Sequence, residues 1–123
     1  MRISLALCAF AVLLAALAYV NFTSVHADPE PFDAREWRRR AEQAKQPDPG
    51  CVRGGIALTL LDDRQLNKLG KNEVIARLGP AEVMRDDQLR YSLGQCHWDW
   101  RQSDLVITVA PDGAVVSVTI EAG

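Results

Sequence analysis

The hydrophobic pattern divides the chain into three regions. Ile3 to Val20 is apolar almost throughout, and Asp28 to Gly50 is dominated by charged residues and prolines. Beyond Pro80, apolar residues recur at every second position, which is the period of a strand with one buried face. We therefore expect a leader over residues 1–27, a Pro-rich tether over 28–50 and one folded domain over 51–123.

Two short helices are predicted near the start of this domain. The first runs from Leu60 to Leu69 with Thr59 as its cap, and Gly70 is expected to end it in the left-handed conformation. The second covers Asn72 to Leu78, and Gly79-Pro80 stops it because proline cannot continue a helix. Together they form a helical hairpin whose second helix buries Val74, Ile75 and Leu78.

Three strands follow, each with one buried face. A turn is expected at Ala110-Pro111-Asp112-Gly113-Ala114, where proline sets the first corner and glycine supplies a positive φ. Strands joined by tight turns form an antiparallel meander, and the helices would cover one of its faces. The predicted fold class is α+β: a short helical hairpin packed on one face of a 3–4-stranded antiparallel β-meander. The inward residues are expected to be Leu89, Tyr91, Leu93, Leu105, Ile107, Val109, Val116, Val118 and Ile120.

The most chemically varied segment is Cys96-His97-Trp98-Asp99-Trp100. Interpreted as a strand, it points its thiol and both indoles inward. The alternation slips by one residue at Gly94, which predicts a β-bulge there. The side chains that would then face solvent are Gln95, His97, Asp99 and Arg101.

This segment does not predict a metal site or a catalytic centre. Cys96 and His97 are neighbours on opposite faces of the expected strand, so they cannot converge on one ion. His97, the only histidine after the leader, is expected to lie exposed on the surface of the strand rather than to activate a nucleophile. We therefore expect a protein that is not an enzyme and that carries no metal or cofactor.

The tether contains one short predicted helix, from Asp33 to Lys45. Asp33 is its N-cap, and Glu36 stands where a capping-box glutamate belongs. Its run of arginines, Arg38 to Arg40, suggests either a docking surface or a solvated helix face. The second interpretation is favoured, with Arg38 paired to Glu42 one turn on.

The leader has the features of a secretory signal peptide. Arg2 precedes the apolar run, and Val25-His26-Ala27 ends in a small residue, so cleavage is expected after Ala27. The protein would then be periplasmic or secreted. The alternative is an uncleaved inner-membrane anchor over residues 3–20, which reach the lower length limit for a span.

Charge and cysteine content refine this picture. One of the 14 Lys and Arg residues and none of the 16 acidic residues lies before Asp28, so the exported part carries a net charge of −3. That balance argues against non-specific nucleic-acid binding. Two cysteines follow the leader, Cys51 and Cys96, and in an exported protein they are expected to form a disulfide. Closing so long a loop stabilises by about 4 kcal/mol in the chain-entropy description.

Three short motifs resemble those of a known family. Leu78-Gly79-Pro80 ends a helix, Tyr91-Ser92-Leu93-Gly94 lies on a strand, and Asp112-Gly113 joins two closing strands. This arrangement, over about Leu60 to Ile120, resembles the small bacterial envelope domains typified by the SmpA/OmlA lipoprotein of the outer-membrane β-barrel assembly machine. The fold of β-lactamase inhibitor protein is similar. The chain departs from the assembly lipoprotein because a bulky leucine precedes Cys8, so no lipid-attachment cysteine is present.

The resemblance implies a non-enzymatic protein that binds other proteins of the cell envelope or assists outer-membrane assembly. Two alternatives are a structural or stress-resistance envelope protein without a dedicated partner, and a secreted inhibitor of an enzyme. Partners would be envelope proteins, with membrane association through an uncleaved N-terminal segment. The candidate contact residues lie on the outward face of the sheet and on the helix of the tether: Trp37, Arg90, His97, Asp99 and Arg101.

Overall fold

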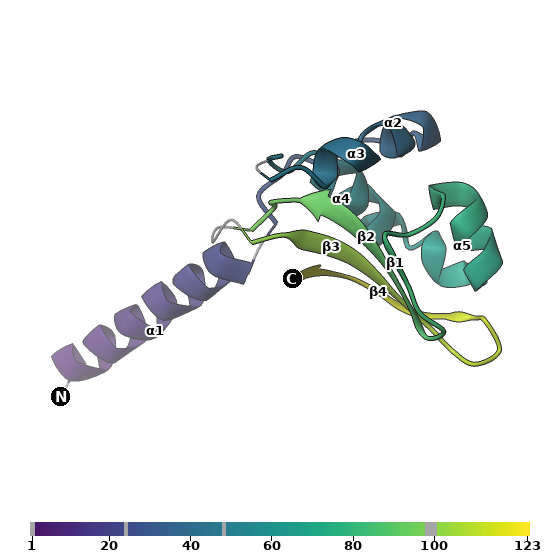
Figure 1. Cartoon of the computed structure of the whole chain (residues 1–123). Helices are drawn as coiled ribbons and strands as arrows, with labels where there is room; N and C mark the ends of the chain where they lie inside the picture. Colours follow the sequence, from purple (N-terminus) through teal and green to yellow (C-terminus); the bar gives the residue numbers. More distant parts are fainter. Residues whose placement is uncertain (1, 24, 48, 98–100) are drawn as a thin grey trace.

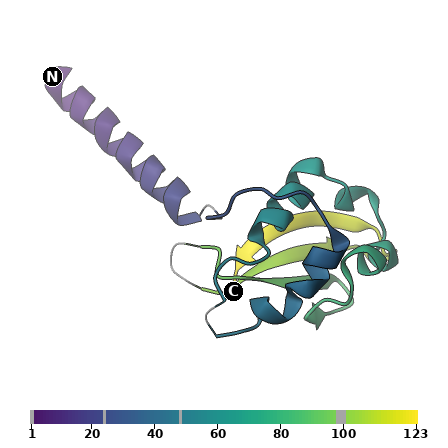
Figure 2. The ribbon, with the colours of Figure 1, turned by 90° about the horizontal axis from the view of Figure 1, so that it is seen from above.

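A four-stranded antiparallel sheet with helices on one face forms the domain, and one long helix projects from it (Figures 1 and 2). The computed structural model describes residues 2–23, 25–47, 49–97 and 101–123. The projecting helix is α1 (Arg2–Thr23), whose described side chains are exposed. The remaining helices are α2 (Ala34–Arg39), α3 (Ala41–Ala44), α4 (Gly54–Asp63), the 3₁₀ turn η1 (Leu66–Lys68) and α5 (Lys71–Leu78).

The sheet is a meander in the order β1-β2-β3-β4. Its strands are β1 (Val83–Met84), β2 (Gln88–Gly94), β3 (Ser103–Val109) and β4 (Val115–Ala122). The predicted turn closes between the Ala110 N–H and the Ala114 carbonyl, 2.8 Å apart. The predicted α+β class, with helices covering one face of an antiparallel meander, is confirmed. The core between the layers includes Trp37, Ile56, Leu60, Val74, Leu78, Leu89, Tyr91, Leu105 and Ile107.

Two irregularities adjust the register of the sheet. The predicted bulge is present between Ser92 and Gly94, and Gly94 has φ +94°. A β-carbon on Gly94 would overlap the Gly50 carbonyl oxygen, so glycine is required for this close approach. A second shift pairs Val109 with Val115 and leaves Val116 62% exposed. The expectation that Val116 faces inward is therefore wrong, whereas Val118 and Ile120 do pack against the core.

The first helix of the domain lies earlier than predicted. α4 starts at Gly54 and ends at Asp63, where Arg64 rather than Gly70 takes the left-handed conformation, with φ 52°. Gly70 is extended and precedes α5, and its N–H donates to the Glu73 carboxylate. α5 itself agrees with the predicted second helix to within one residue.

The segment expected to be a tether is part of the domain. Its helix forms in two pieces, α2 and α3, and the predicted cap is present because the Asp33 carboxylate accepts the Arg35 and Glu36 N–H groups. Trp37 and Ala44, one from each piece, are fully buried. A solvated linker would leave both exposed, so the expected tether is corrected to a packed layer formed by α2 and α3. The reason is the burial of a large indole, which holds the segment on the sheet.

The predicted partner of Arg38 is also wrong. Arg38 Nη2 donates to the Ala76 carbonyl at the end of α5, and Glu42 pairs instead with Lys45. Glu36 pairs with Arg39 and Arg40. The arginine run thus joins α2 to neighbouring segments.

Candidate functional site

The face of the sheet turned away from the helices carries a charged cluster built around Arg90. Leu89 and Tyr91 point into the core, so Arg90 between them points to the opposite face. Its guanidinium donates to Asp104 Oδ2 at 3.2 Å and to Glu121 Oε2 at 3.2 Å. These carboxylates lie on β3 and β4, directly opposite one another in the register. One side chain therefore bridges three strands.

The remaining neighbours hold this guanidinium in place. Arg90 Nε donates to Gln88 Oε1 at 2.9 Å, on the same strand and the same face. Val106 pairs with both Arg90 and Thr119 in the register, and it is only 2% exposed. The cluster thus has a buried aliphatic centre and a charged rim. We call Gln88, Arg90, Asp104, Val106, Thr119 and Glu121 the open-face cluster.

Trp37, the first predicted contact residue, does not lie on the surface. Its side chain is fully buried, its ring centroid is 5.9 Å from that of Tyr91, and its indole N–H donates to the Leu78 carbonyl at 3.0 Å. The expectation of an exposed indole is wrong. The sequence signal that favoured burial was its size, since it is the largest apolar group of its segment.

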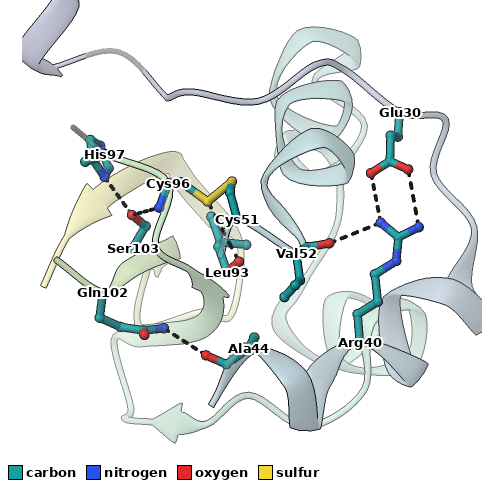
Figure 3. The surroundings of a disulfide bond; sticks show 10 residues. All are labelled: Glu30, Arg40, Ala44, Cys51, Val52, Leu93, Cys96, His97, Gln102 and Ser103. Atoms are coloured by element: carbon teal, nitrogen blue, oxygen red, sulfur yellow. Dashed lines mark hydrogen bonds and ion pairs between the residues drawn. A yellow bond between two sulfur atoms is a disulfide. The ribbon is translucent and has the colours of Figure 1, made fainter. Parts of the chain in front are cut away.

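His97 is buried as well, contrary to the predicted outward orientation. It is 9% exposed, and its Nδ1 lies 2.7 Å from Ser103 Oγ (Figure 3). The strand β2 has already ended at Gly94, so the alternation no longer applies at His97. Asp99 lies outside the described residues, as do Trp98 and Trp100. Arg101 is exposed.

The His97–Ser103 pair has the spacing of a base and a nucleophile, but its surroundings give it a structural role. Ser103 has no exposed surface, and its Oγ accepts the Cys96 N–H at 3.0 Å. A serine nucleophile must reach its substrate. The pair therefore holds the loop after β2 against the start of β3.

The predicted disulfide between Cys51 and Cys96 is confirmed. It joins the loop before α4 to the loop after β2, beside the His97–Ser103 pair (Figure 3). Two backbone hydrogen bonds run parallel to it, from the Arg53 N–H to the Leu93 carbonyl and from the Gln95 N–H to the Gly50 carbonyl. The bond thus reinforces an existing backbone junction.

Arg53 is a central residue that the sequence did not indicate, because it precedes two glycines and lies outside every predicted helix and strand. It is 2% exposed and lies 4.0 Å from the centroid of the Trp37 ring. Its guanidinium donates to the carbonyls of Trp37 and Ser92 and pairs with Glu82 at 3.4 Å. Burial lowers the pKa of Arg53, and the Glu82 carboxylate opposes that change.

A cleft of about 400 Å³ opens beside Arg53, between the α2–α3 layer and the loop that follows α5. Of its charged side chains, Lys45 pairs with Glu42, Arg53 pairs with Glu82, and Arg38 donates to the Ala76 carbonyl. Beside this cleft the Tyr91 hydroxyl donates to the Gly79 carbonyl at 2.8 Å, and burial raises the pKa of this phenol. This hydrogen bond holds the Leu78–Pro80 turn against β2.

Within the described ranges, no three His, Cys, Asp or Glu side chains are placed to hold a metal ion.

The fold and these sites define a class of protein: a disulfide-bonded α+β domain that follows an apolar helix long enough to cross a membrane. No protein-family profile matches the chain, and no curated protein or solved structure is significantly similar to it. The resemblance to SmpA/OmlA-like domains therefore stays a prediction.

Proposed function

We propose that this protein is an exported, non-catalytic module of the bacterial cell envelope that binds another protein through the open-face cluster. The proposal rests on a contrast between the buried polar side chains, which bond within the domain, and the charged side chains of the open-face cluster, which remain accessible to solvent. Arg53, Tyr91 and His97 are buried and bonded to the protein's own backbone or to Ser103. Arg90 and its partners instead present charge on the face of the sheet opposite the described helices α2 to α5 (Figure 1).

The apolar helix and the disulfide support export. Disulfides persist in oxidising compartments, and the Cys51–Cys96 bond lies in a domain that directly follows α1. The periplasm of a bacterium with two membranes is the compartment that the proposal assigns. The assembly-accessory role implied by the SmpA/OmlA resemblance is one version of the proposal.

The chemistry of the open-face cluster specifies the kind of partner. Three strands hold the guanidinium, so little side-chain freedom is lost when it is covered. The cluster carries one positive and two negative charges, and Glu121 is the more exposed carboxylate, at 48% against 16% for Asp104. A complementary protein surface would present a basic side chain to Glu121 and an acceptor to Arg90.

Charge reversal on this face tests the proposal. Glu121→Lys and Arg90→Glu should each abolish cross-linking to a specific envelope protein in intact cells. The matched control is Arg39→Glu, which reverses an exposed arginine on α2 and should leave cross-linking intact. The thermal midpoint of each variant must lie above the assay temperature, because Arg90→Glu places a third carboxylate beside Asp104 and Glu121. Unchanged cross-linking in both face variants would contradict the proposal and favour a structural envelope protein without a dedicated partner.

A further inference from the structure

The residues that follow α1 are built into the domain from Val25 onward. Val25 packs against the core, and the His26 N–H donates to the Cys96 carbonyl at 2.7 Å. The Glu30 N–H donates to the Gly55 carbonyl at 3.0 Å, and its carboxylate accepts from both Arg40 Nη atoms (Figure 3). We call residues 25–32 the strap.

The first turn of α4 is shaped to receive this strap. A β-carbon on Gly55 would overlap the Asp28 carbonyl oxygen, and one on Gly54 would overlap the disulfide sulfurs. The Ala27 methyl group lies 3.4 Å from that same Gly54 position. Gly55 therefore admits the backbone of Asp28 against the helix, and Gly54 makes room for the disulfide beside the Ala27 methyl group. The fit includes residues on both sides of the expected cleavage point after Ala27.

The length of the apolar segment favours a membrane anchor over a cleaved signal peptide. Arg2–Val20 has a mean hydropathy of 2.5, and none of its residues is buried in the domain. The 18 residues from Ile3 to Val20 exceed the apolar core of about 7–15 residues found in signal peptides and reach the range of spanning helices. α1 ends at Thr23, so a single residue separates it from the packed Val25.

We propose that α1 stays attached as a transmembrane anchor, and that the strap seats the domain directly on the lipid bilayer. Cleavage after Ala27 would remove the Val25 packing and the His26 hydrogen bond from beside the disulfide. This inference revises the cleavage expected from the sequence. It rests on the proposed export of the domain and not on its binding of a protein.

The seating also orients the sheet. α1 joins the domain at the end that holds the Cys96 loop, and the β1–β2 and β3–β4 turns lie at the opposite end (Figure 1). The disulfide end therefore faces the bilayer. Residues 85–88 and 110–114, which form these two turns, lie at the end of the sheet away from the bilayer (Figure 1).

The test follows the full-length chain in a Gram-negative host, by fractionation and intact mass. The expected product has a mass that includes residues 2–23, stays in the membrane pellet after an alkaline carbonate wash, and is digested when spheroplasts are exposed to external protease. In detergent, the His26 and Glu30 amides should exchange with deuterium slowly. A soluble periplasmic species that begins at Asp28 would overturn the anchor while leaving export intact. A membrane-bound, full-length chain protected from external protease would retain the anchor but overturn the export on which the proposal rests.

A matched variant tests whether length is the deciding property. Deleting Ala11–Leu14 shortens the apolar run from 18 to 14 residues and leaves Val25-His26-Ala27 unchanged. This shortened chain should be cleaved and released, whereas the parent is not. If the parent and the shortened chain are both released as the Asp28 species, the retained anchor is refuted.

Discussion

Arg53 and Arg90 are the same side chain in two different settings. Each pairs with a carboxylate on another element, but Arg53 is 2% exposed in the helical layer and Arg90 is 28% exposed on the open face. Arg53 donates to two backbone carbonyls, whereas the hydrogen bonds of Arg90 all go to side chains on the surface of the sheet. Burial thus ties Arg53 to the folding of the domain, whereas Arg90 stays accessible to a partner of the kind proposed above.

The partners of Arg53 come from segments far apart in the chain. Trp37 belongs to the α2 segment, and Ser92 to β2. Arg53 therefore fastens the α2–α3 layer to the sheet, and the indole stacked on its guanidinium shields these bonds from water. Its loss would leave buried acceptors without a donor. The loss of Arg90 would return its carboxylates to solvent.

The largest expected effect comes from the disulfide that positions the loop carrying Arg53. The double variant Cys51→Ser/Cys96→Ser should lower the free energy of unfolding by about 4 kcal/mol, because the unfolded chain regains the freedom of a 45-residue loop. Urea unfolding of the full-length protein in detergent measures this change in the free energy of unfolding. Cys8→Ser, at the exposed free thiol, is the control and should change nothing.

Next in size is Arg53 itself. Arg53→Ala should destabilise by about 3 kcal/mol, since it leaves Glu82 and two buried carbonyls without their partner. Arg53→Lys should recover only part of this loss, because an ammonium lacks the planar fork that reaches several acceptors. Unfolding midpoints in urea decide the order. A loss as small as that of Arg90→Ala would contradict the division between the two arginines.

Tyr91 links the buried cluster to pH. Burial raises its pKa above the ordinary value near 10, so the unfolded state releases the phenol proton first as pH rises. Its contribution is present at neutral pH and is lost above about pH 10. Tyr91→Phe should cost about 1 kcal/mol at pH 7, through the lost bond to Gly79, and should flatten the alkaline decline. Thermal midpoints between pH 7 and 11 test both parts.

The smallest effect on stability is expected at Arg90. Arg90→Ala should change the free energy of unfolding by less than about 1 kcal/mol, and the difference should shrink in high salt. The same variant should weaken cross-linking to the envelope partner. A large stability loss without any change in cross-linking would place Arg90 in the same structural role as Arg53.

Local chemistry explains which elements were predictable. The period of two located β2 and β3, Gly94 marked the bulge, and Gly79-Pro80 ended α5 where expected. The prediction of a tether over residues 28–50 was wrong. Prolines and charged residues indicate solvent exposure, but they do not show that Trp37 in the same segment is buried. The start of α4 was missed because Gly54 and Gly55 disfavour a helix locally. Their value lies in the contacts that they permit with the disulfide and the strap.

The sequence by itself determined the apolar N-terminal segment, the pairing of the two cysteines and the antiparallel meander. Each depends on residue type and spacing along a short stretch of chain or on a count of cysteines. Only the tertiary structure decided the roles of Trp37, Arg53 and His97, because burial is set by segments that meet after folding. Trp37 bonds to Leu78, 41 residues away, and Arg53 bonds to Ser92, 39 residues away. A local sequence pattern does not show which polar groups become buried when distant segments pack together.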